Sequence, residues 1–252
     1  MTYARERKLT PIVVVRSRSK LETILDERSV PKETITAQLT IIEGNIKNPA
    51  AVKSTIQRSS SSALAVDMII SGVGGAPTFS PNPLKPGLDD PTICQDGMRT
   101  ILNCLREIKS ERKPLVVALS TTGMSDAGRD IPVLMIPLYY WLLAVPHQDK
   151  KTMEEMLLAE VGRKKAEEGA IRGFVVVRAS LLTNGERIGA DKVRVGIETP
   201  KTNADDNEGE LVPAIGYTIS TNDVGSWVYE KLVQESTNAG TKYLNKYVTI
   251  TY

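Results

Sequence analysis

The feature that most constrains the fold is a regular alternation of short apolar runs with longer stretches of helical character. The runs are rich in Val, Ile and Leu: "PIVVV" (11–15), "AQLTIIEG" (37–44), "AVDMIISGVG" (65–74), "PLVVALST" (114–121), "RGFVVVRAS" (172–180) and "AIGYTIS" (214–220). Apolar runs of this length, without strict alternation, are typical of parallel strands that are buried on both faces.

Helical patterns fill the segments between these runs. The clearest is "PTICQDGMRTILNCLREIKS" (91–110), where apolar residues recur three and four positions apart. Asn48 and Asp90 each precede a proline at an apparent helix start, as an N-cap residue does. The alternation predicts βαβ units and an α/β fold, a Rossmann-like doubly wound parallel sheet with helices on both faces.

Length and charge exclude several classes of function. The chain has 252 residues, enough for a single large domain over residues 1–252. It carries 32 Lys and Arg against 30 Asp and Glu, so we expect neither nucleic acid nor an anionic membrane as a partner. Two cysteines and one histidine give little material for a disulfide framework or a metal site. We expect no metal and a small molecule as the ligand.

The longest apolar stretch is "IPVLMIPLYYWLLAVP" (131–146), which prolines interrupt twice. It is too short and too broken for a membrane span, so we expect a buried loop-and-helix lid. Elements around 131–150 and 181–213 are expected to cover the substrate, and 198–213 reads as an exposed polar loop. Because no signal-type segment is apparent, we expect a cytoplasmic protein.

Ligands of open α/β sheets bind beyond the carboxyl ends of the strands. Arg16, Ser17 and Lys20 follow the first apolar run. A guanidinium can hold a phosphate through two parallel hydrogen bonds, and an arginine here accommodates the 2′-phosphate of NADP in dinucleotide-binding folds. Solvated surface cations are the alternative.

Other small or polar residues follow the next three runs, where backbone can approach a ligand closely. They are Gly44, Asn45, Gly72, Val73, Gly74, Ser120 and Thr121. The turn "SGVGGAP" is not a GxGxxG fingerprint and "LSTTGMSDAG" is not a phosphate loop, so ordinary loops are the alternative at each place. Taken together, the four positions favour a dinucleotide site.

The ordered motifs carry a resemblance. They read "VVVRSRSKL … IEGNIKNPAAV … VDMIISGVGG … PLVVALSTTG … HQDKKTMEEML … FVVVRASLLTNG … ISTNDVGSWVYEKL". This order resembles atypical short-chain dehydrogenase/reductases of the NmrA-like, NAD(P)-binding family, and is similar to fungal oxidoreductases associated with polyketide-type secondary-metabolite clusters. The resemblance implies an NADP(H)-dependent oxidoreductase acting on a small-molecule metabolite, a ketone or a quinone-like polyketide. Because the family also includes dinucleotide sensors that regulate a protein partner, a non-catalytic sensor is the alternative.

The family's first strand and its GATGxxG loop should precede "PIVVV". Only "MTYA" and "RERKLTP" resemble the ends of that segment, so about 20–25 residues are expected to be missing between Ala4 and Arg5. Such a loss would leave buried backbone groups unpaired, at about 1–3 kcal/mol each, and would remove the helix N-terminus that binds a pyrophosphate. We therefore expect poor cofactor affinity, or an inactive truncated form.

The standard catalytic pair of short-chain reductases is absent, because no tyrosine has a lysine four residues later. The resemblance instead aligns Asp149, Lys150 and Glu154 with a "DKxxxE" helix start. It implies that Lys150 binds ribose hydroxyls or orients a proton donor near the nicotinamide, with His147 a possible acid. The alternative for this segment is a helix N-terminus with a Thr152–Glu155 capping box and exposed lysines.

Three further readings concern aromatic, basic and thiol side chains. Tyr139 and Tyr140 could cover a flat substrate or pack in the core. Arg178 matches the family's strand-ending "RP" position and is expected to be structural. The two cysteines, Cys94 and Cys104, are most simply core residues.

Overall fold

The computed structural model describes residues 9–57, 64–79, 86–108, 110–163, 169–200, 212–235 and 241–252. The chain divides into two compact units. Unit 1 comprises Met1–Val66 and Thr100–Glu111, and unit 2 comprises Asp67–Arg99 and Arg112–Tyr252. The sequence remnants expected at residues 1–8, and most of the expected loop 198–213, lie outside the described residues.

Unit 1 is built around two parallel strands. They pair from Ile12 opposite Thr40 to Val15 opposite Glu43. Its elements are β1 (Ile12–Val15), α1 (Arg18–Glu27), α2 (Lys32–Gln38), β2 (Thr40–Glu43) and α3 (Pro49–Ile56). The predicted cap of α3 is confirmed, because the Asn48 side chain accepts the Ala50 N–H at 3.0 Å.

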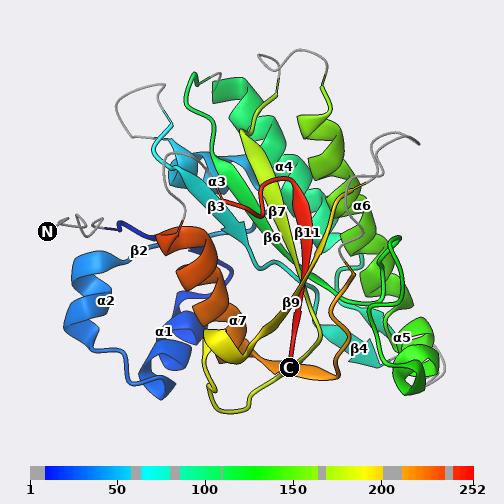
Figure 1. Ribbon diagram of the computed structural model, residues 1–252. Coiled ribbons are helices and arrows are strands. Elements are labelled where there is room, and N and C mark those ends of the chain that lie inside the picture. The colour runs from blue at the N-terminus through cyan, green and yellow to red at the C-terminus, as the bar shows by residue number, and fades with distance from the viewer. Residues whose placement is uncertain are drawn as a thin grey trace, which may run out of the picture. The chain divides into compact units, whose positions relative to one another are not determined.

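Unit 2 contains a five-stranded sheet in the order β3-β6-β7-β11-β9 (Figure 1). The strands are β3 (Met68–Ser71), β6 (Leu115–Thr121), β7 (Gly173–Ala179), β9 (Arg194–Glu198) and β11 (Lys246–Thr251). The first four in the sheet order run parallel, and β9 runs antiparallel to β11. A central, mostly parallel sheet with helices around it confirms the predicted α/β fold class.

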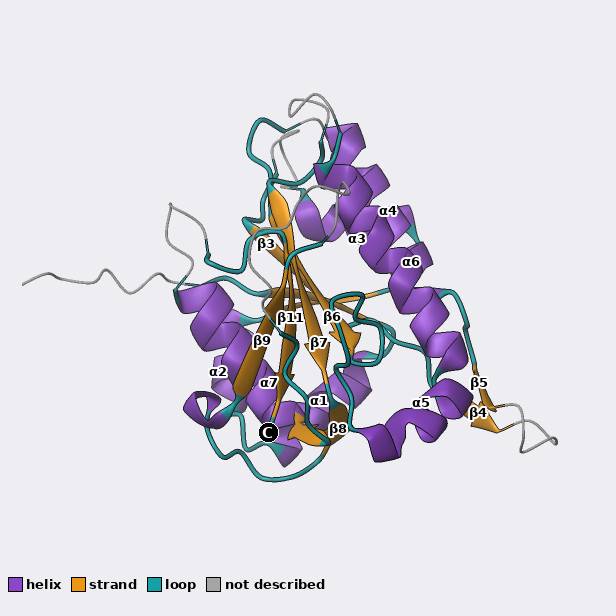
Figure 2. Ribbon diagram, turned by 45° about the vertical axis from the view of Figure 1, so that its right-hand side comes forward, coloured by secondary structure: helices purple, strands orange, loops and turns teal. Residues whose placement is uncertain are grey.

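Helices and small strand pairs complete the described chain (Figure 2). The helices are α4 (Ile93–Ile108), η1 (Val133–Met135), α5 (Ile136–Leu142), α6 (Ala144–Val161), η2 (Ala190–Lys192), α7 (Thr221–Val228) and the π-helix η3 (Tyr229–Gln234). Two pairs of short strands are β4 (Pro77–Phe79) with β5 (Pro86–Leu88), and β8 (Leu181–Thr183) with β10 (Thr218–Ser220). Within the described ranges, no helix combines the length and the apolar character needed to cross a bilayer.

The core of unit 2 forms where alternate residues of the central strands meet α7 and η3. Its fully buried members include Leu115, Val117, Val175, Val177, Trp227, Leu232, Val248 and Ile250. The intervening residues of β6 and β7 point to the other face, on which α6 packs. Every residue of β7 is buried, so the expectation of strands covered on both faces is confirmed there.

Two features differ from the sequence expectations. The first is β11, which no apolar run predicts because Thr249 and Thr251 interrupt its pattern. Both threonines are nevertheless fully buried, and the Thr251 hydroxyl bonds with that of Ser180 at 2.9 Å. From the sequence alone, a buried threonine whose hydroxyl has a hydrogen-bond partner cannot be distinguished from a solvent-exposed threonine.

The second difference is the apolar stretch 131–146, which forms η1, α5 and the start of α6. Pro132 precedes η1 and Pro137 lies in the first turn of α5, where a proline costs no helical hydrogen bond. Val133, Leu134 and Tyr140 are 65%, 81% and 76% exposed. The expectation of a buried lid is wrong at these positions.

Gly196 of β9 provides a test of the packing in unit 2. A Cβ at this position would overlap the Ala214 nitrogen and lie 2.7 Å from the Pro213 carbonyl carbon. Because backbone atoms cannot move aside as a flexible side chain can, we expect Gly196→Ala to lower the free energy of unfolding by about 3 kcal/mol. A Cβ at Gly225 of α7 meets no atom within 4 Å, so Gly225→Ala should raise that energy by up to about 1 kcal/mol. Urea denaturation checks both values, and equal effects would contradict the packing described.

Candidate functional site

The carboxyl ends of β1 and β2 form one edge in unit 1. The Gly44 N–H donates to the Val15 carbonyl at 2.9 Å, so the residues that follow the two strands are neighbours. Ser17 caps α1, with its hydroxyl oxygen accepting the Lys20 N–H at 3.4 Å. The structure thus brings five predicted cofactor residues to this edge: Arg16, Ser17, Lys20, Gly44 and Asn45. Arg16 and Lys20 are exposed cations there.

Gly44 and Asn45 also have local structural roles at this edge. A Cβ on Gly44 would lie 2.7 Å from the Cβ of Ala51, so glycine allows α3 to pack close to the strand end. The Asn45 side chain accepts the Lys47 N–H at 2.9 Å and closes the turn that leads into α3.

A second edge lies in unit 2, at the carboxyl ends of the adjacent strands β3 and β6. The turn Gly72–Gly74 follows β3, and Ser120 and Thr121 end β6. The Lys150 ammonium on α6 donates to the Leu119 carbonyl at 2.9 Å. The predicted residues Gly72, Val73, Gly74, Ser120, Thr121 and Lys150 therefore belong to this edge.

A cavity of about 360 Å³ opens beside this edge, within the size range of small-molecule sites. Most of its lining is apolar: Pro77, Pro86, Leu88, Leu142, Leu143 and Pro146, with Gly74, Gly75 and Gly87. Its polar lining residues are Cys94, Asp149 and Lys150. Sequence reasoning named only Gly74 and Lys150 of this set as site residues. Leu142, Leu143 and Pro146 lie in the segment 131–150 that was expected to cover the substrate, whereas the walls at 75–88 come from segments that carry no chemical motif.

Asp149 is buried and holds the start of α4. Its two carboxylate oxygens accept the N–H groups of Cys94 and Gln95, each at 2.9 Å, where the positive end of the helix dipole favours an anion. Burial raises the pKa of the Cys94 thiol to about 12, so the group stays protonated near neutral pH. The thiol donates to the Val73 carbonyl at 3.2 Å.

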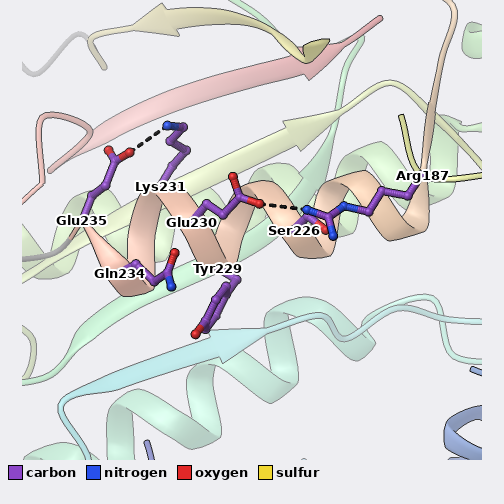
Figure 3. Close-up of a pocket in the computed structure, with 7 residues that line it drawn as sticks. All are labelled: Arg187, Ser226, Tyr229, Glu230, Lys231, Gln234 and Glu235. Atoms are coloured by element: carbon purple, nitrogen blue, oxygen red, sulfur yellow. Dashed lines mark hydrogen bonds and ion pairs between the residues drawn. The ribbon is translucent and has the colours of Figure 1, made fainter. Parts of the chain in front are cut away.

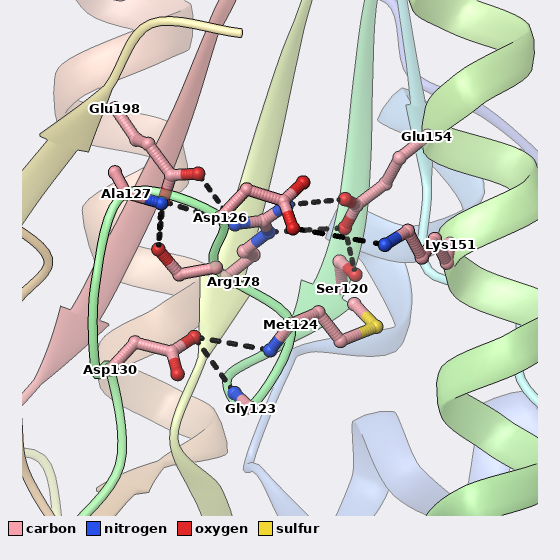
Figure 4. A network of polar contacts seen from close by, with 11 residues as sticks. Ser120, Gly123, Met124, Asp126, Ala127, Asp130, Lys151, Glu154, Arg178 and Glu198 are labelled. Atoms are coloured by element: carbon pink, nitrogen blue, oxygen red, sulfur yellow. Dashed lines mark hydrogen bonds and ion pairs between the residues drawn. The ribbon is translucent and has the colours of Figure 1, made fainter. Parts of the chain in front are cut away.

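Arg178 of β7 lies between two buried carboxylates (Figure 4). Its Nε and Nη2 donate to Glu154 of α6 at 3.3 and 2.7 Å, and its Nη1 donates to Glu198 of β9 at 3.1 Å. The centroid of the Tyr247 ring lies 4.3 Å from the Arg178 Cζ atom. Burial alone would lower the pKa of Arg178, but the two glutamates outweigh it and raise it, so the guanidinium stays charged.

The same network fixes α6 on the end of β6. Glu154 accepts the Ser120 hydroxyl at 2.6 Å, and Lys150 lies one helical turn earlier with its bond to Leu119. The Ser125 hydroxyl donates to Glu198 at 2.7 Å, which attaches the loop after β6 to the same group. These contacts agree with the structural role expected for Arg178.

His147, Tyr139 and Tyr140 lie outside the lining of the cavity. A Cβ on Gly123, whose φ is +93°, would lie 2.8 Å from both the His147 and the Tyr139 rings, so the two pack against this turn. The Tyr139 hydroxyl is 3.3 Å from the Thr122 hydroxyl, and Tyr140 is exposed.

The His147 ring is mostly enclosed. Among the described residues its Nε2 atom has no hydrogen-bond partner. Burial lowers the pKa of His147 more than Asp130 raises it, so we expect a neutral ring at pH 7.

Helix α6 begins at Ala144, and the Thr152 hydroxyl donates to the Gln148 carbonyl inside it. The Thr152–Glu155 capping box is therefore wrong.

A second hollow, of about 520 Å³, lies along α7 and η3 (Figure 3). It is a polar groove whose charged groups pair with each other, Arg187 with Glu230 at 2.9 Å and Lys231 with Glu235 at 2.7 Å. None of the predicted site residues lines it. A search of the described ranges finds no group of three or more His, Cys, Asp or Glu placed to hold a metal ion.

The chain is similar to two curated fungal proteins. Reductase pytE of Aspergillus terreus is 43% identical over 245 residues, a match that covers 95% of this chain and 87% of the relative. The chain belongs to the family of this reductase. Oxidase pynE of Aspergillus niger is 32% identical over 270 residues, covering 95% of this chain and 89% of the relative. The expected similarity to fungal oxidoreductases is confirmed, although no protein-family profile matches the chain.

Two solved structures resemble the chain in fold. The oxidoreductase ylbE of Lactococcus lactis gives a TM-score of 0.52 at 13% identity, covering 95% of this chain and 90% of its own. A Lactobacillus casei protein gives a TM-score of 0.54 at 12% identity, covering 98% of this chain and 89% of its own. At such low identity these likenesses support the Rossmann-type fold alone.

The buried network holds two carboxylates, Glu154 and Glu198, and one guanidinium, Arg178. Substitutions of the two kinds of group should therefore change the free energy of unfolding by different amounts. Arg178→Met leaves Glu154 and Glu198 buried without a cation, so we expect a loss of about 3–5 kcal/mol in the free energy of unfolding. Glu154→Gln leaves the Arg178–Glu198 pair intact and should cost about 1–2 kcal/mol. The control Lys231→Met removes a half-buried lysine that pairs with Glu235 at the surface, and it should change stability by less than about 1 kcal/mol.

The pH dependence of the same variants sharpens this test. In Arg178→Met the two buried carboxylates lose their cation, so burial and mutual repulsion penalise their charged forms in the folded state and not in the unfolded chain. The stability of that variant should therefore fall as the pH rises from 5 to 8, relative to the unsubstituted chain. Denaturation at both pH values measures the difference, and a larger cost for Glu154→Gln than for Arg178→Met would refute the charge assignment.

Proposed function

We propose that the chain is an NADP(H)-dependent oxidoreductase of the atypical, NmrA-like short-chain class that acts on a small-molecule metabolite. The observation that carries the proposal is the position of Lys150, a cation at the carboxyl edge of β3 and β6 that also lines an apolar cavity. This edge of an open α/β sheet is where ligands bind in such folds. The names reductase and oxidase of the two fungal relatives support redox chemistry.

The residues of the unit 2 edge suit the nicotinamide half of a dinucleotide. A Cβ on Gly74 would meet no atom within 4 Å, and one on Gly72 would meet only the Leu119 side chain at 3.6 Å, so the turn leaves space beside its backbone. When bound, a nicotinamide dinucleotide supplies or accepts a hydride. In the proposal the turn Gly72–Gly74 and the end of β6 hold this half of the molecule.

The unit 1 edge suits the adenosine half and its phosphate. Arg16 and Lys20 are exposed cations beside the N-cap of α1, and a guanidinium can bind a 2′-phosphate through two hydrogen bonds. In the proposal Arg16 selects NADP(H) over NAD(H), and Gly44 and Asn45 accept the adenine.

Lys150 is the proposed hydrogen-bond and proton donor. Its ammonium has three N–H groups and gives one to Leu119, which leaves donors for a substrate oxygen or a ribose hydroxyl. Donation to a carbonyl oxygen stabilises the negative charge that develops there during reduction, and transfer of the proton completes the alcohol. His147 is a weaker candidate, because its lowered pKa leaves the ring neutral at pH 7.

A non-catalytic dinucleotide sensor is the second candidate function. The absence from the sequence of any tyrosine with a lysine four residues later favours it. NADPH oxidation in the presence of ketones distinguishes the two, since a sensor binds the dinucleotide without turnover. A sensor would instead change its affinity for a protein partner when NADP is added.

Arg16 provides a test of cofactor choice. We expect Arg16→Ala to weaken NADPH binding at least tenfold and to leave NADH binding unchanged, because only NADPH presents the extra phosphate. The control is Arg18→Ala, since Arg18 pairs with Glu22 at 3.4 Å. Fluorescence titration measures each affinity, and an unaltered ratio of NADPH to NADH affinity in Arg16→Ala would refute the role of Arg16.

Lys150 and Lys151 form a matched pair for a catalytic test. Lys151 is the next residue of α6 but faces Asp126 at 3.8 Å and does not line the cavity. We expect Lys150→Met to lower kcat for an apolar ketone by 100-fold or more, as loss of a proton donor does, and Lys151→Met to stay within about twofold. Steady-state NADPH oxidation measures both, and equal losses would exclude a specific role for Lys150.

A further inference from the structure

The polar side chains that line the cavity differ in how many of their hydrogen-bonding groups already have a protein partner. Asp149 has both carboxylate oxygens occupied by backbone N–H groups, and the Cys94 thiol donates to the Val73 carbonyl. Lys150 gives one of its three donors to Leu119. Of the described side chains that line the cavity, Lys150 is thus the one that keeps donors for a ligand.

The remaining wall is apolar and has little freedom to rearrange. Pro77 and Pro86 come from the paired strands β4 and β5, where Pro77 lies opposite Leu88. Leu143 and Pro146 come from the junction of α5 and α6. A carboxylate or phosphate on the body of a ligand, away from the Lys150 ammonium, would lose its water against these side chains without gaining a partner, at a large cost.

We infer that this cavity takes a compact apolar carbonyl compound, whose one accepting oxygen meets Lys150, and that it rejects substrates with a carboxylate or phosphate on their body. The inference rests on the proposed function only in calling this ligand the substrate. Binding itself is a property of the cavity in unit 2.

Three naphthalene compounds of similar shape test this directly in the unsubstituted chain, without added dinucleotide. They are 2-acetylnaphthalene, which is an apolar ketone, 2-ethylnaphthalene, which lacks the oxygen, and 6-acetyl-2-naphthoic acid, which adds a carboxylate. Because a hydrogen bond from a charged donor is lost in the hydrocarbon and a charge is desolvated in the acid, we expect the ketone to bind at least tenfold more tightly than either. Isothermal titration calorimetry measures the three affinities.

Two substitutions locate the bound ketone. Lys150→Met should remove the tenfold difference between the ketone and the hydrocarbon. Gly74→Val should weaken both at least tenfold, because its side chain enters space that is free of protein atoms and borders the cavity. The control is Gly225→Val on α7, where a Cβ also meets no atom within 4 Å but the residue does not line the cavity. Circular dichroism melting confirms that each variant is folded.

The outcomes separate this inference from the proposed function. Equal affinities for ketone and hydrocarbon, or an acid that binds as tightly as the ketone, would overturn it even if no variant folds. Selective ketone binding without NADPH oxidation would support the cavity assignment and count against an oxidoreductase. NADPH oxidation with carboxylated substrates alone would support an oxidoreductase and overturn the inference.

Discussion

The arrangement of unit 2 depends on one guanidinium that serves two buried carboxylates. Arg178 can do so because its five N–H donors form a planar fork, two of which meet Glu154 while another meets Glu198. Any slip of α6 along the sheet would separate buried charges, which is far more costly than repacking apolar side chains. The network therefore fixes the register of α6 on the sheet more firmly than its apolar face alone would.

In that register, the adjacent residues Asp149 and Lys150 of α6 point to different elements and differ in how many of their hydrogen-bonding groups have partners. Asp149 points to the start of α4, where each of its two oxygens accepts a backbone N–H group. Lys150 points to the end of β6, where a single carbonyl leaves it with unused donors beside an apolar cavity. Lys150 is thus held in place with donors left for a ligand, next to an aspartate whose two oxygens both have backbone partners.

The sequence predicts those parts of the fold whose signals are local. Six strands follow from the six apolar runs, namely β1, β2, β3, β6, β7 and β10, and the Asn48 cap follows from its proline neighbour. The strand β11 escapes prediction because buried Thr249 and Thr251 resemble solvated residues, and the cavity wall escapes because Pro77 and Pro86 read as loop residues. Contacts between distant segments, such as that of Asp149 with the start of α4, cannot be inferred from a short stretch of sequence. Sequence reasoning could therefore name candidate site residues mainly at the ends of the strands.

The preference for Lys150 over His147 in the proposed function also follows from packing. The turn after β6 needs a glycine at position 123, since φ is +93° there, and it is held because the Asp130 carboxylate accepts the N–H groups of Gly123 and Met124. This fixed turn encloses the His147 ring, and enclosure disfavours the imidazolium. The Lys150 ammonium instead has the Leu119 carbonyl as a partner and lines the cavity, so in the proposed function it can donate to a ligand that the enclosed His147 ring does not border.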